Sequence, residues 1–240
     1  MRSINHSARL HRVWPLWVVV TIALLQAGWV TRTLAQELTP TAAVSQATIK
    51  IVAFGDSLIA GYGLDAEDAF PAKMQAALRD QYPNLEIVNA GVSGDTTAAA
   101  LSRYDWAIPN DADGAMVLLG GNDFLRGLSP KRMRKNLDTI LTKLKAQKLD
   151  ILLLGMKAPR NTGRNYYTAF DATFPDLAKK HDALLDSFFL EGVAMQRKLN
   201  QIDGIHPNRA GVEKIVARLT PKVNALITRI LKSRTARTDG

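Results

Sequence analysis

A serine, a histidine and an aspartate stand in settings where they could together break an acyl bond. Ser57 lies in Gly55-Asp56-Ser57-Leu58, directly after an apolar run, and Asp203 and His206 lie three residues apart near the C-terminus. A serine hydroxyl attacks an acyl carbon once a base removes its proton, and histidine does this well when a carboxylate orients its ring. We therefore interpret Ser57 as nucleophile, His206 as base and Asp203 as the group that orients His206.

Acyl transfer also needs hydrogen-bond donors aimed at the carbonyl oxygen that gains negative charge during attack. Gly94 stands in Ser93-Gly94-Asp95 and Asn122 in Gly120-Gly121-Asn122-Asp123. We predict an oxyanion hole formed by the backbone N–H groups of Ser57 and Gly94 and by the side-chain amide of Asn122.

One other histidine follows residue 35, and it is a weaker candidate. His181 lies within the charged segment Lys179-Lys180-His181-Asp182, late in a helical pattern. We expect its ring to face solvent and to take no part in catalysis.

Apolar runs alternate with amphipathic stretches along the chain, and the two kinds of segment predict strands and helices. The predicted strands are Ile49–Phe54, Leu85–Asn89, Ala115–Leu119, Ile151–Gly155 and Ala183–Asp186. The predicted helices are Ala69–Gln81, Thr97–Trp106, Pro130–Gln147, Tyr166–His181 and Arg209–Leu231. Strict alternation predicts an α/β fold, a flavodoxin-like doubly wound sheet of about five parallel strands with helices on both faces. Such sheets bind ligands beyond the carboxyl ends of their strands, where Ser57, Gly94 and Asn122 each follow a strand.

Together, the Gly55–Leu58, Gly94, Gly120–Asp123 and Asp203–His206 blocks resemble the GDSL or SGNH hydrolase family, most closely its small bacterial esterase, thioesterase and lysophospholipase branch. The resemblance covers roughly residues 48 to 220, and no catalytic position departs from the family pattern. It implies the SGNH hydrolase fold, the roles given above for the five site residues, an acyl-enzyme intermediate, and neither metal nor cofactor.

The resemblance also implies a small ester or thioester substrate, and lipids are one source of such compounds. Aryl or short-acyl esters, acyl thioesters and lysophospholipids are the candidates, with carbohydrate acetyl esters as the alternative. Binding loops lie at the carboxyl edge of such a sheet. We expect Phe124, Leu125 and Leu128, together with Met156 and the segment after it as far as Tyr167, to form the walls of the acyl pocket.

Each block also has a simpler interpretation. Ser57 could cap a helix, Gly94 and Asn122 could close turns, and Asp203 with Gly204 could form a surface turn. The inferred sheet alone would suit a non-catalytic flavodoxin-like binding module, because fold does not decide function. An α/β-hydrolase would need Gly-x-Ser-x-Gly and many metalloproteases carry His-Glu-x-x-His, and the chain has neither motif.

The N-terminal segment has the layout of an export signal. Arg2, Arg9 and Arg12 precede the apolar run 13–30, and Thr33-Leu34-Ala35 offers small residues for cleavage. We expect residues 1–35 to be a signal peptide, with an uncleaved membrane anchor as the alternative. Residues 36–47 then form a linker, 48–232 the hydrolase domain and 233–240 a basic polar tail. The protein is expected in the periplasm or secreted.

Composition narrows the classes of partner. The 240 residues include no cysteine, which excludes disulfides, thiolate metal sites and a cysteine nucleophile. The formal net charge is +9, partly from arginines of the leader. Basic residues of 131–148 alternate with apolar ones at helical spacing, so we expect a solvated helix face and no nucleic-acid binding. We interpret Lys232–Arg237 as a frayed end, with weak membrane contact through anionic lipid as the alternative, and expect a monomer.

Overall fold

A computed structural model of the chain describes residues 47–238, and its centre is a five-stranded parallel sheet. The strands lie in the order β2-β1-β3-β4-β5. Their bounds are Ile49–Gly55 for β1, Leu85–Gly91 for β2, Gly114–Leu118 for β3, Asp150–Leu154 for β4 and Leu184–Asp186 for β5. This is the strand order of flavodoxin-like sheets, so the fold class predicted from the alternating pattern is confirmed.

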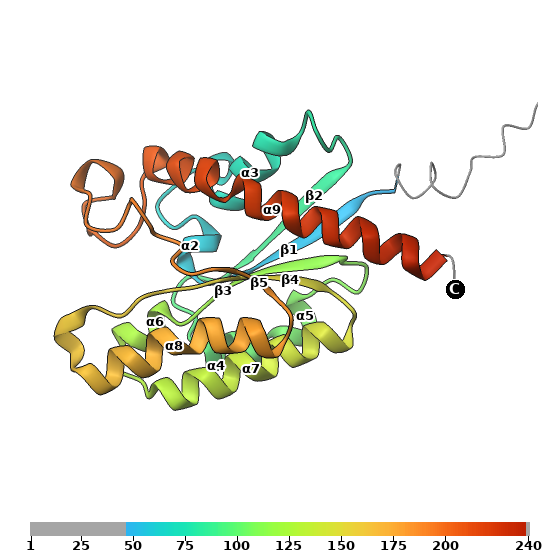
Figure 1. Cartoon of the computed structure of the whole chain (residues 1–240). Helices are drawn as coiled ribbons and strands as arrows, with labels where there is room; N and C mark the ends of the chain where they lie inside the picture. Colours follow the sequence, from blue (N-terminus) through green and yellow to red (C-terminus); the bar gives the residue numbers. More distant parts are fainter. Residues whose placement is uncertain (1–46, 239–240) are drawn as a thin grey trace, which may run out of the picture. The chain divides into compact units, whose positions relative to one another are not determined.

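The sheet is buried on both faces because its strands present apolar side chains to both sides. In β1, Ile51 and Ala53 belong to one apolar core, and Val52 and Phe54 belong to the other. All four side chains are fully buried. Two cores separated by one sheet give the three-layer arrangement of Figure 1.

Helices cover the two faces unequally (Figure 1). On one side lie α3 (Phe70–Leu78) and the long α9 (Arg209–Thr238), whose apolar residues pack in the first core. On the other side lie α4 (Thr97–Ser102), α5 (Tyr104–Ala107), α7 (Pro130–Ala146) and α8 (Arg164–Lys180). The basic side chains of α7 flank a buried apolar stripe, as its periodicity predicts.

Three details differ from the sequence-based expectation. The helix predicted over Thr97–Trp106 is interrupted at Arg103, which separates α4 from α5. Two short helices that no long periodic pattern announces, α2 (Ser57–Ala60) and α6 (Gly121–Leu125), follow β1 and β3 directly. Both begin inside the motif blocks Gly55–Leu58 and Gly120–Asp123, so they belong to the site.

The third difference is the end of α9, which extends past Leu231 to Thr238. The interpretation of Lys232–Arg237 as a frayed end is therefore wrong. Ser233 donates to Asp150, and Arg234 pairs with Asp113 and donates to the carbonyl of Thr48. These contacts tie the last turns of α9 to the amino edge of the sheet. Over residues 47–238, no helix is long and apolar enough to cross a membrane.

Candidate active site

Ser57 is placed by a sharp turn between β1 and α2. Asp56 caps the helix, because its Oδ1 accepts a hydrogen bond from the backbone N–H of Leu58 at 3.1 Å. The turn needs glycine at position 55, since a Cβ there would lie 2.5 Å from Ile59 and 2.6 Å from the carbonyl oxygen of Leu118. Ser57 is thereby the first residue of α2, where backbone N–H groups have no acceptor inside the helix.

His206 and Asp203 meet within one tight loop. Gly204 adopts φ +71°, a conformation that favours glycine, and this folds the carboxylate of Asp203 back over the chain that follows it. Its Oδ1 accepts from the backbone N–H groups of Ile205 and His206, at 2.9 and 3.0 Å. Its Oδ2 lies 2.6 Å from Nδ1 of His206. The backbone N–H of His206, followed by its ring, lowers the pKa of Asp203 to about 2, so this carboxyl is ionised near neutral pH.

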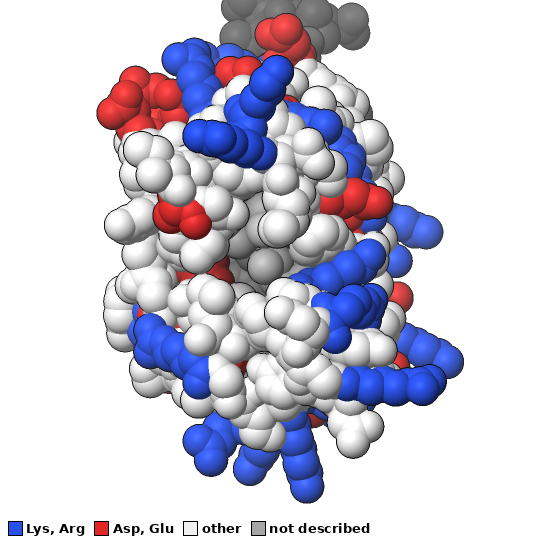
Figure 2. Space-filling view, turned by 90° about the vertical axis from the view of Figure 1, so that its left-hand side faces the viewer, with Lys and Arg blue, Asp and Glu red and all other residues white. Residues whose placement is uncertain are grey.

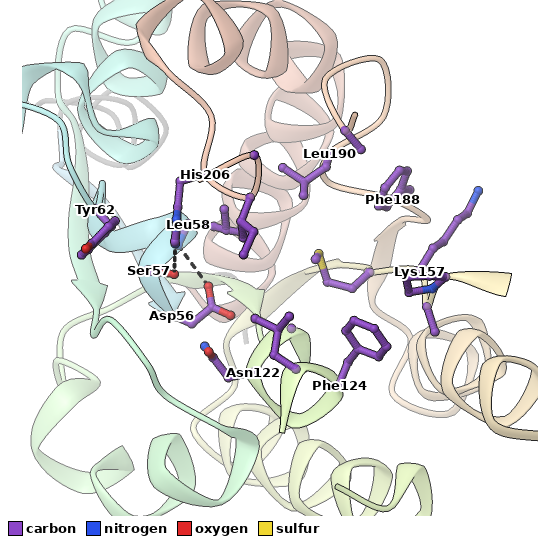
Figure 3. Close-up of a pocket in the computed structure, with 18 of the residues that line it drawn as sticks. Asp56, Ser57, Leu58, Tyr62, Asn122, Phe124, Lys157, Phe188, Leu190 and His206 are labelled. Atoms are coloured by element: carbon purple, nitrogen blue, oxygen red, sulfur yellow. Dashed lines mark hydrogen bonds between the residues drawn. The ribbon is translucent and has the colours of Figure 1, made fainter. Parts of the chain in front are cut away.

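The other ring nitrogen of His206 reaches the serine across 149 positions of sequence. Nε2 of His206 lies 2.8 Å from Oγ of Ser57. With Nδ1–H donated to Asp203, Nε2 is left to accept the hydroxyl proton of Ser57. Figure 3 shows Ser57 between His206 and Asn122, and the ring of Tyr62 packs 4.7 Å from that of His206. The structure thus brings together the three residues that the sequence analysis selected for nucleophile, base and orienting group.

Amide side chains that the sequence analysis overlooked hold the histidine loop. Asn208 Nδ2 donates to the carbonyls of Lys198 and Asn200, and Gln201 Nε2 donates to those of Tyr62 and Pro207. These bonds connect the loop to the segment before it and to the loop after α2. The position of His206 therefore depends on contacts that no local pattern reveals.

The proposed oxyanion donors line the same cavity as Ser57. Gly94 and Asn122 belong to its lining, and Asn122 follows the carboxyl end of β3 on α6. The side-chain amide of Asn122 donates one hydrogen to the backbone carbonyl of Asp95, at 3.0 Å. An amide nitrogen carries two hydrogens, so the second stays available to a substrate oxygen.

A buried arginine, Arg103, lies behind this edge of the sheet. Its side chain is 7% exposed, and its Nε pairs with Oδ2 of Asp95. Its Nη2 donates to the carbonyls of Gly55 and Ala90, both at 2.9 Å, and the guanidinium stacks on the ring of Phe54. Arg103 is not among the predicted site residues, because it stands inside a segment predicted to be one continuous helix.

Two further aspartates of the motif blocks are buried beside the site. Burial, with smaller contributions from the neighbouring Asp95 and Asp123 carboxylates, raises the pKa of Asp56 to about 7 against the opposing effect of the Leu58 N–H and His206. Asp123 accepts hydrogen bonds from both the backbone N–H and the hydroxyl of Thr97, each at 2.7 Å. Asp123 therefore fixes the start of α4 against α6.

A cavity of about 710 Å³ opens beside Ser57, within the usual range for ligand pockets. In Figure 3, Ser57 and His206 stand at one end and Lys157 at the other, between walls that carry Phe124 on one side and Phe188 with Leu190 on the other. Figure 2 shows the hollow in this face, bordered mainly by uncharged residues. The walls are thus suited to hydrocarbon, with the reactive groups at one end.

Three of the four predicted wall residues line the cavity: Phe124, Leu125 and Met156. Leu128 does not, and that prediction is wrong. Its backbone N–H bonds to the carbonyl of Asp123 and its carbonyl accepts from Tyr166, which turns this segment back toward α7 and α8. After β4, the lining stops at Pro159 and does not continue to Tyr167.

Other wall residues come from loops that the sequence analysis did not connect with the pocket. These are Tyr62, Phe188, Leu190, Ala194, Met195 and Ile205. Tyr62 follows α2, Phe188 and Leu190 follow β5, and Ala194 and Met195 precede the histidine loop, so nothing in their local spacing places them around Ser57. Ile205 lies inside the histidine loop, next to His206.

His181 lies away from the site, as expected, but it does not face solvent. Its side chain is 8% exposed, and Nε2 lies 2.6 Å from Oδ1 of Asp138. Lys180 bonds to the same carboxylate. The charged sequence around His181 misled the prediction, because α8 turns this end toward α7. Within residues 47–238, no group of three or more histidine or acidic side chains is arranged to hold a metal ion.

The chain is similar to known proteins in both sequence and fold. The sequence model of the GDSL-like lipase/acylhydrolase family matches residues 53–214. Esterase TesA of Pseudomonas aeruginosa is 35% identical over 178 residues, which cover 74% of this chain and 89% of that protein. Thioesterase 1/protease 1/lysophospholipase L1 of Escherichia coli is 40% identical over 161 residues, covering 66% of this chain and 76% of that protein.

Among solved structures, AlinE4, described as an SGNH-hydrolase family esterase, is 50% identical to this chain. The similarity covers 74% of this chain and 96% of AlinE4, with a TM-score of 0.63.

Proposed function

Because the chain belongs to the GDSL-like lipase/acylhydrolase family, we propose that it is an exported serine esterase that acts through Ser57, His206 and Asp203. Its homologues are named as an esterase and as a thioesterase and lysophospholipase, which supports hydrolysis of an acyl ester or thioester. The observation that carries the proposal is the ring of His206, which contacts Asp203 on one side and Ser57 on the other at the end of an apolar cavity.

In the proposed first step, Oγ of Ser57 attacks the acyl carbon while its proton passes to Nε2 of His206. The carbonyl oxygen gains negative charge, which the N–H groups of Ser57, Gly94 and Asn122 stabilise. Collapse of this intermediate breaks the bond to the alcohol or thiol, and His206 returns the proton to that leaving group. Asp203 stays ionised and stabilises the charged ring of His206 meanwhile.

In the second step, water attacks the acyl group on Ser57 and His206 accepts the proton of that water. When the second intermediate collapses, the carboxylic acid leaves and the proton returns to Oγ of Ser57. Every group used is a side chain or a backbone N–H of this chain, so the reaction requires no metal.

The cavity favours acyl chains over sugars as the group beside Ser57. Phe124, Leu125, Met156, Phe188 and Leu190 supply apolar walls, and a carbohydrate acetyl ester would leave its hydroxyl groups without partners there. We therefore propose aryl and acyl esters, acyl thioesters and lysophospholipids as substrates, ahead of carbohydrate acetyl esters.

Hydrolysis of p-nitrophenyl acetate, butyrate, octanoate and laurate, beside an acyl thioester, tests this proposal. We expect turnover of at least the shorter esters, unchanged by EDTA, and a kcat/KM that rises with chain length until the cavity is filled. Loss of activity on chelation and its return with zinc would contradict the serine mechanism. A preference for acetylated sugars over every acyl ester would favour the carbohydrate esterase.

Export is a separate part of the proposal, and it concerns residues outside those that the structure describes. The basic start, the apolar run 13–30 and Thr33-Leu34-Ala35 support a signal peptide removed after Ala35. N-terminal sequencing of the protein from its native cell should then begin at Gln36, in material found outside the cytoplasm. A retained Met1 in a membrane fraction would favour the anchor.

A further inference from the structure

The three donors of the proposed oxyanion hole come from three separate segments. Ser57 starts α2, Gly94 lies in the loop after β2, and Asn122 lies on α6 after β3. A donor stabilises the transition state best when its position is set before the reaction begins, since any reorganisation then costs free energy. Some contact must therefore hold the three segments in register with one another.

Arg103 is the residue on which these segments converge. Its Nη2 donates to the carbonyl of Gly55, two residues before Ser57, and its Nε pairs with the carboxylate of Asp95, the residue after Gly94. The backbone carbonyl of Asp95 accepts the hydrogen bond from Asn122. Ser57 and Gly94 thus lie within two residues of a group that Arg103 binds. Asn122 is connected to Asp95 by one hydrogen bond.

The environment of Arg103 makes this arrangement rigid. The side chains of Arg103 and Asp95 are 7% and 10% exposed, and the guanidinium packs 4.4 Å from the ring centroid of Phe54. A third carbonyl, that of Ala90 at the end of β2, accepts from the same Nη2. A planar guanidinium bonds a carboxylate and carbonyls at fixed angles, which a lysine ammonium cannot reproduce.

We propose that Arg103 is a positioning residue that aligns the oxyanion-hole donors through Gly55 and Asp95. Arg103 touches neither substrate nor Ser57 in this account, so its effect passes through Asn122 and the two backbone donors. The inference rests on the proposed serine mechanism and adds to it the residue that sets the geometry of charge stabilisation.

The test is a double-mutant cycle in kcat between Arg103→Met and Asn122→Ala in the full chain, with p-nitrophenyl butyrate as substrate. Active sites are counted by titration with a phosphonate that labels the nucleophile, so that unfolded protein does not enter kcat. We expect Arg103→Met to lower kcat per active site by about ten- to a hundredfold with little change in KM. In the Asn122→Ala background, the same change should cost several-fold less, on the order of threefold to tenfold, because one of the three donors that Arg103 positions is absent.

Arg234 provides the matched control. It also pairs with one aspartate, Asp113, and donates to the backbone carbonyls of Ala47 and Thr48, but these contacts lie at the amino end of β1, away from Ser57. Arg234→Met should lower thermal stability while kcat per active site stays near wild type. Should Arg103→Met yield too little folded protein, Arg103→Lys replaces it, with a smaller loss of kcat and the same dependence on Asn122.

Two results would overturn the inference. One is a kcat per active site unchanged by either Arg103 substitution. The other is an equal fractional loss in the wild-type and Asn122→Ala backgrounds, which would assign Arg103 to general stability. Neither result touches the serine mechanism, which Ser57→Ala tests separately: retained activity in that variant would contradict it.

Discussion

Among residues 47–238, two histidine–aspartate pairs have the same short nitrogen–oxygen distance, and we expect them to have different roles. His206 lies 2.6 Å from Asp203 and His181 lies 2.6 Å from Asp138. The first pair occupies a loop at the carboxyl edge of the sheet, and the second joins the C-terminal end of α8 to the middle of α7. A short contact between imidazole and carboxylate is therefore not in itself a sign of catalysis.

The difference lies in what stands on the far side of each ring. Nε2 of His206 faces the hydroxyl of Ser57 and a cavity, whereas Nε2 of His181 is the nitrogen that binds Asp138. Asp138 also receives Lys180, which satisfies its charge within the helix pair. Contact with Ser57 and with the cavity makes His206 a candidate base. His181 has neither contact, so we interpret its pair with Asp138 as structural.

The largest expected effect separates the two pairs directly. Ser57→Ala and His206→Ala should each reduce kcat by a factor approaching about 10⁶, and the double variant should lose about the same factor, because either change disables the nucleophile. Kinetics on one ester with all three variants measures this. Multiplicative losses in the double variant would contradict a Ser57–His206 unit.

The next largest effect is expected at Asn122, which lies beside the Ser57–His206 pair and has no equivalent beside His181. Asn122→Ala should lower kcat by about a hundred- to a thousandfold with KM little changed, as expected for an oxyanion donor. A residue that only closes a turn would instead cost about 0.5–2 kcal/mol of stability and leave the chemistry intact. Folded Asn122→Ala that keeps more than about a tenth of wild-type kcat would remove it from the site.

The carboxyl of Asp56, beside Ser57, differs from that of Asp203 in how protein stability should depend on pH. Burial raises its pKa in the folded state from the ordinary 3.8 to about 7, so the folded protein holds this proton more tightly than the unfolded chain. Stability attributable to Asp56 is therefore fully present below about pH 4 and declines as pH rises to about 7. Asp203 has the opposite shift, and it loses its stabilising contribution only as pH falls from about 4 through its folded pKa of about 2.

Asp56→Asn tests this assignment, since asparagine retains the capping oxygen and carries no titrating proton. Relative to wild type, the variant should be more stable at about pH 8 than at about pH 5, by on the order of 2 kcal/mol. Urea unfolding of both proteins at the two pH values measures the difference. Parallel pH dependences would show that Asp56 does not titrate in this window.

The smallest effect is expected at His181. His181→Ala removes one hydrogen bond to a carboxylate that Lys180 still satisfies, so it should cost about 0.5–1.5 kcal/mol of stability. Its kcat should match wild type, which chemical denaturation and ester kinetics on one preparation would establish. A fall in kcat as large as that of Asn122→Ala would show that the two pairs are coupled.

Much of the fold follows from local pattern, and the exceptions have physical causes. All five strands were predicted within two residues at each end, because buried parallel strands are short continuous apolar runs. Arg103 could not be foreseen as a helix break, since its buried position depends on Asp95 and on carbonyls of two strands. The last turns of α9 form because Ser233 and Arg234 find partners more than eighty positions away.

The site divides in the same way. Ser57, Gly94, Asn122, Asp203 and His206 stand in short blocks whose residue types suit one reaction, so sequence alone selects them. Tyr62, Phe188 and Met195 enter the cavity wall through tertiary packing, which no spacing encodes. The error at Leu128 arises for the same reason, because hydrogen bonds to Asp123 and Tyr166 decide where that loop turns.

Covalent labelling of the nucleophile tests the central claim most directly. A p-nitrophenyl phosphonate ester transfers its phosphonyl group to an activated serine hydroxyl and releases nitrophenol, and intact mass spectrometry counts the groups added. We predict one adduct, located on Ser57, in wild type and in His181→Ala, no adduct in Ser57→Ala, and severely slowed labelling in His206→Ala. An adduct on another residue, or undiminished labelling of His206→Ala, would contradict the assignment of Ser57 and His206 as nucleophile and base.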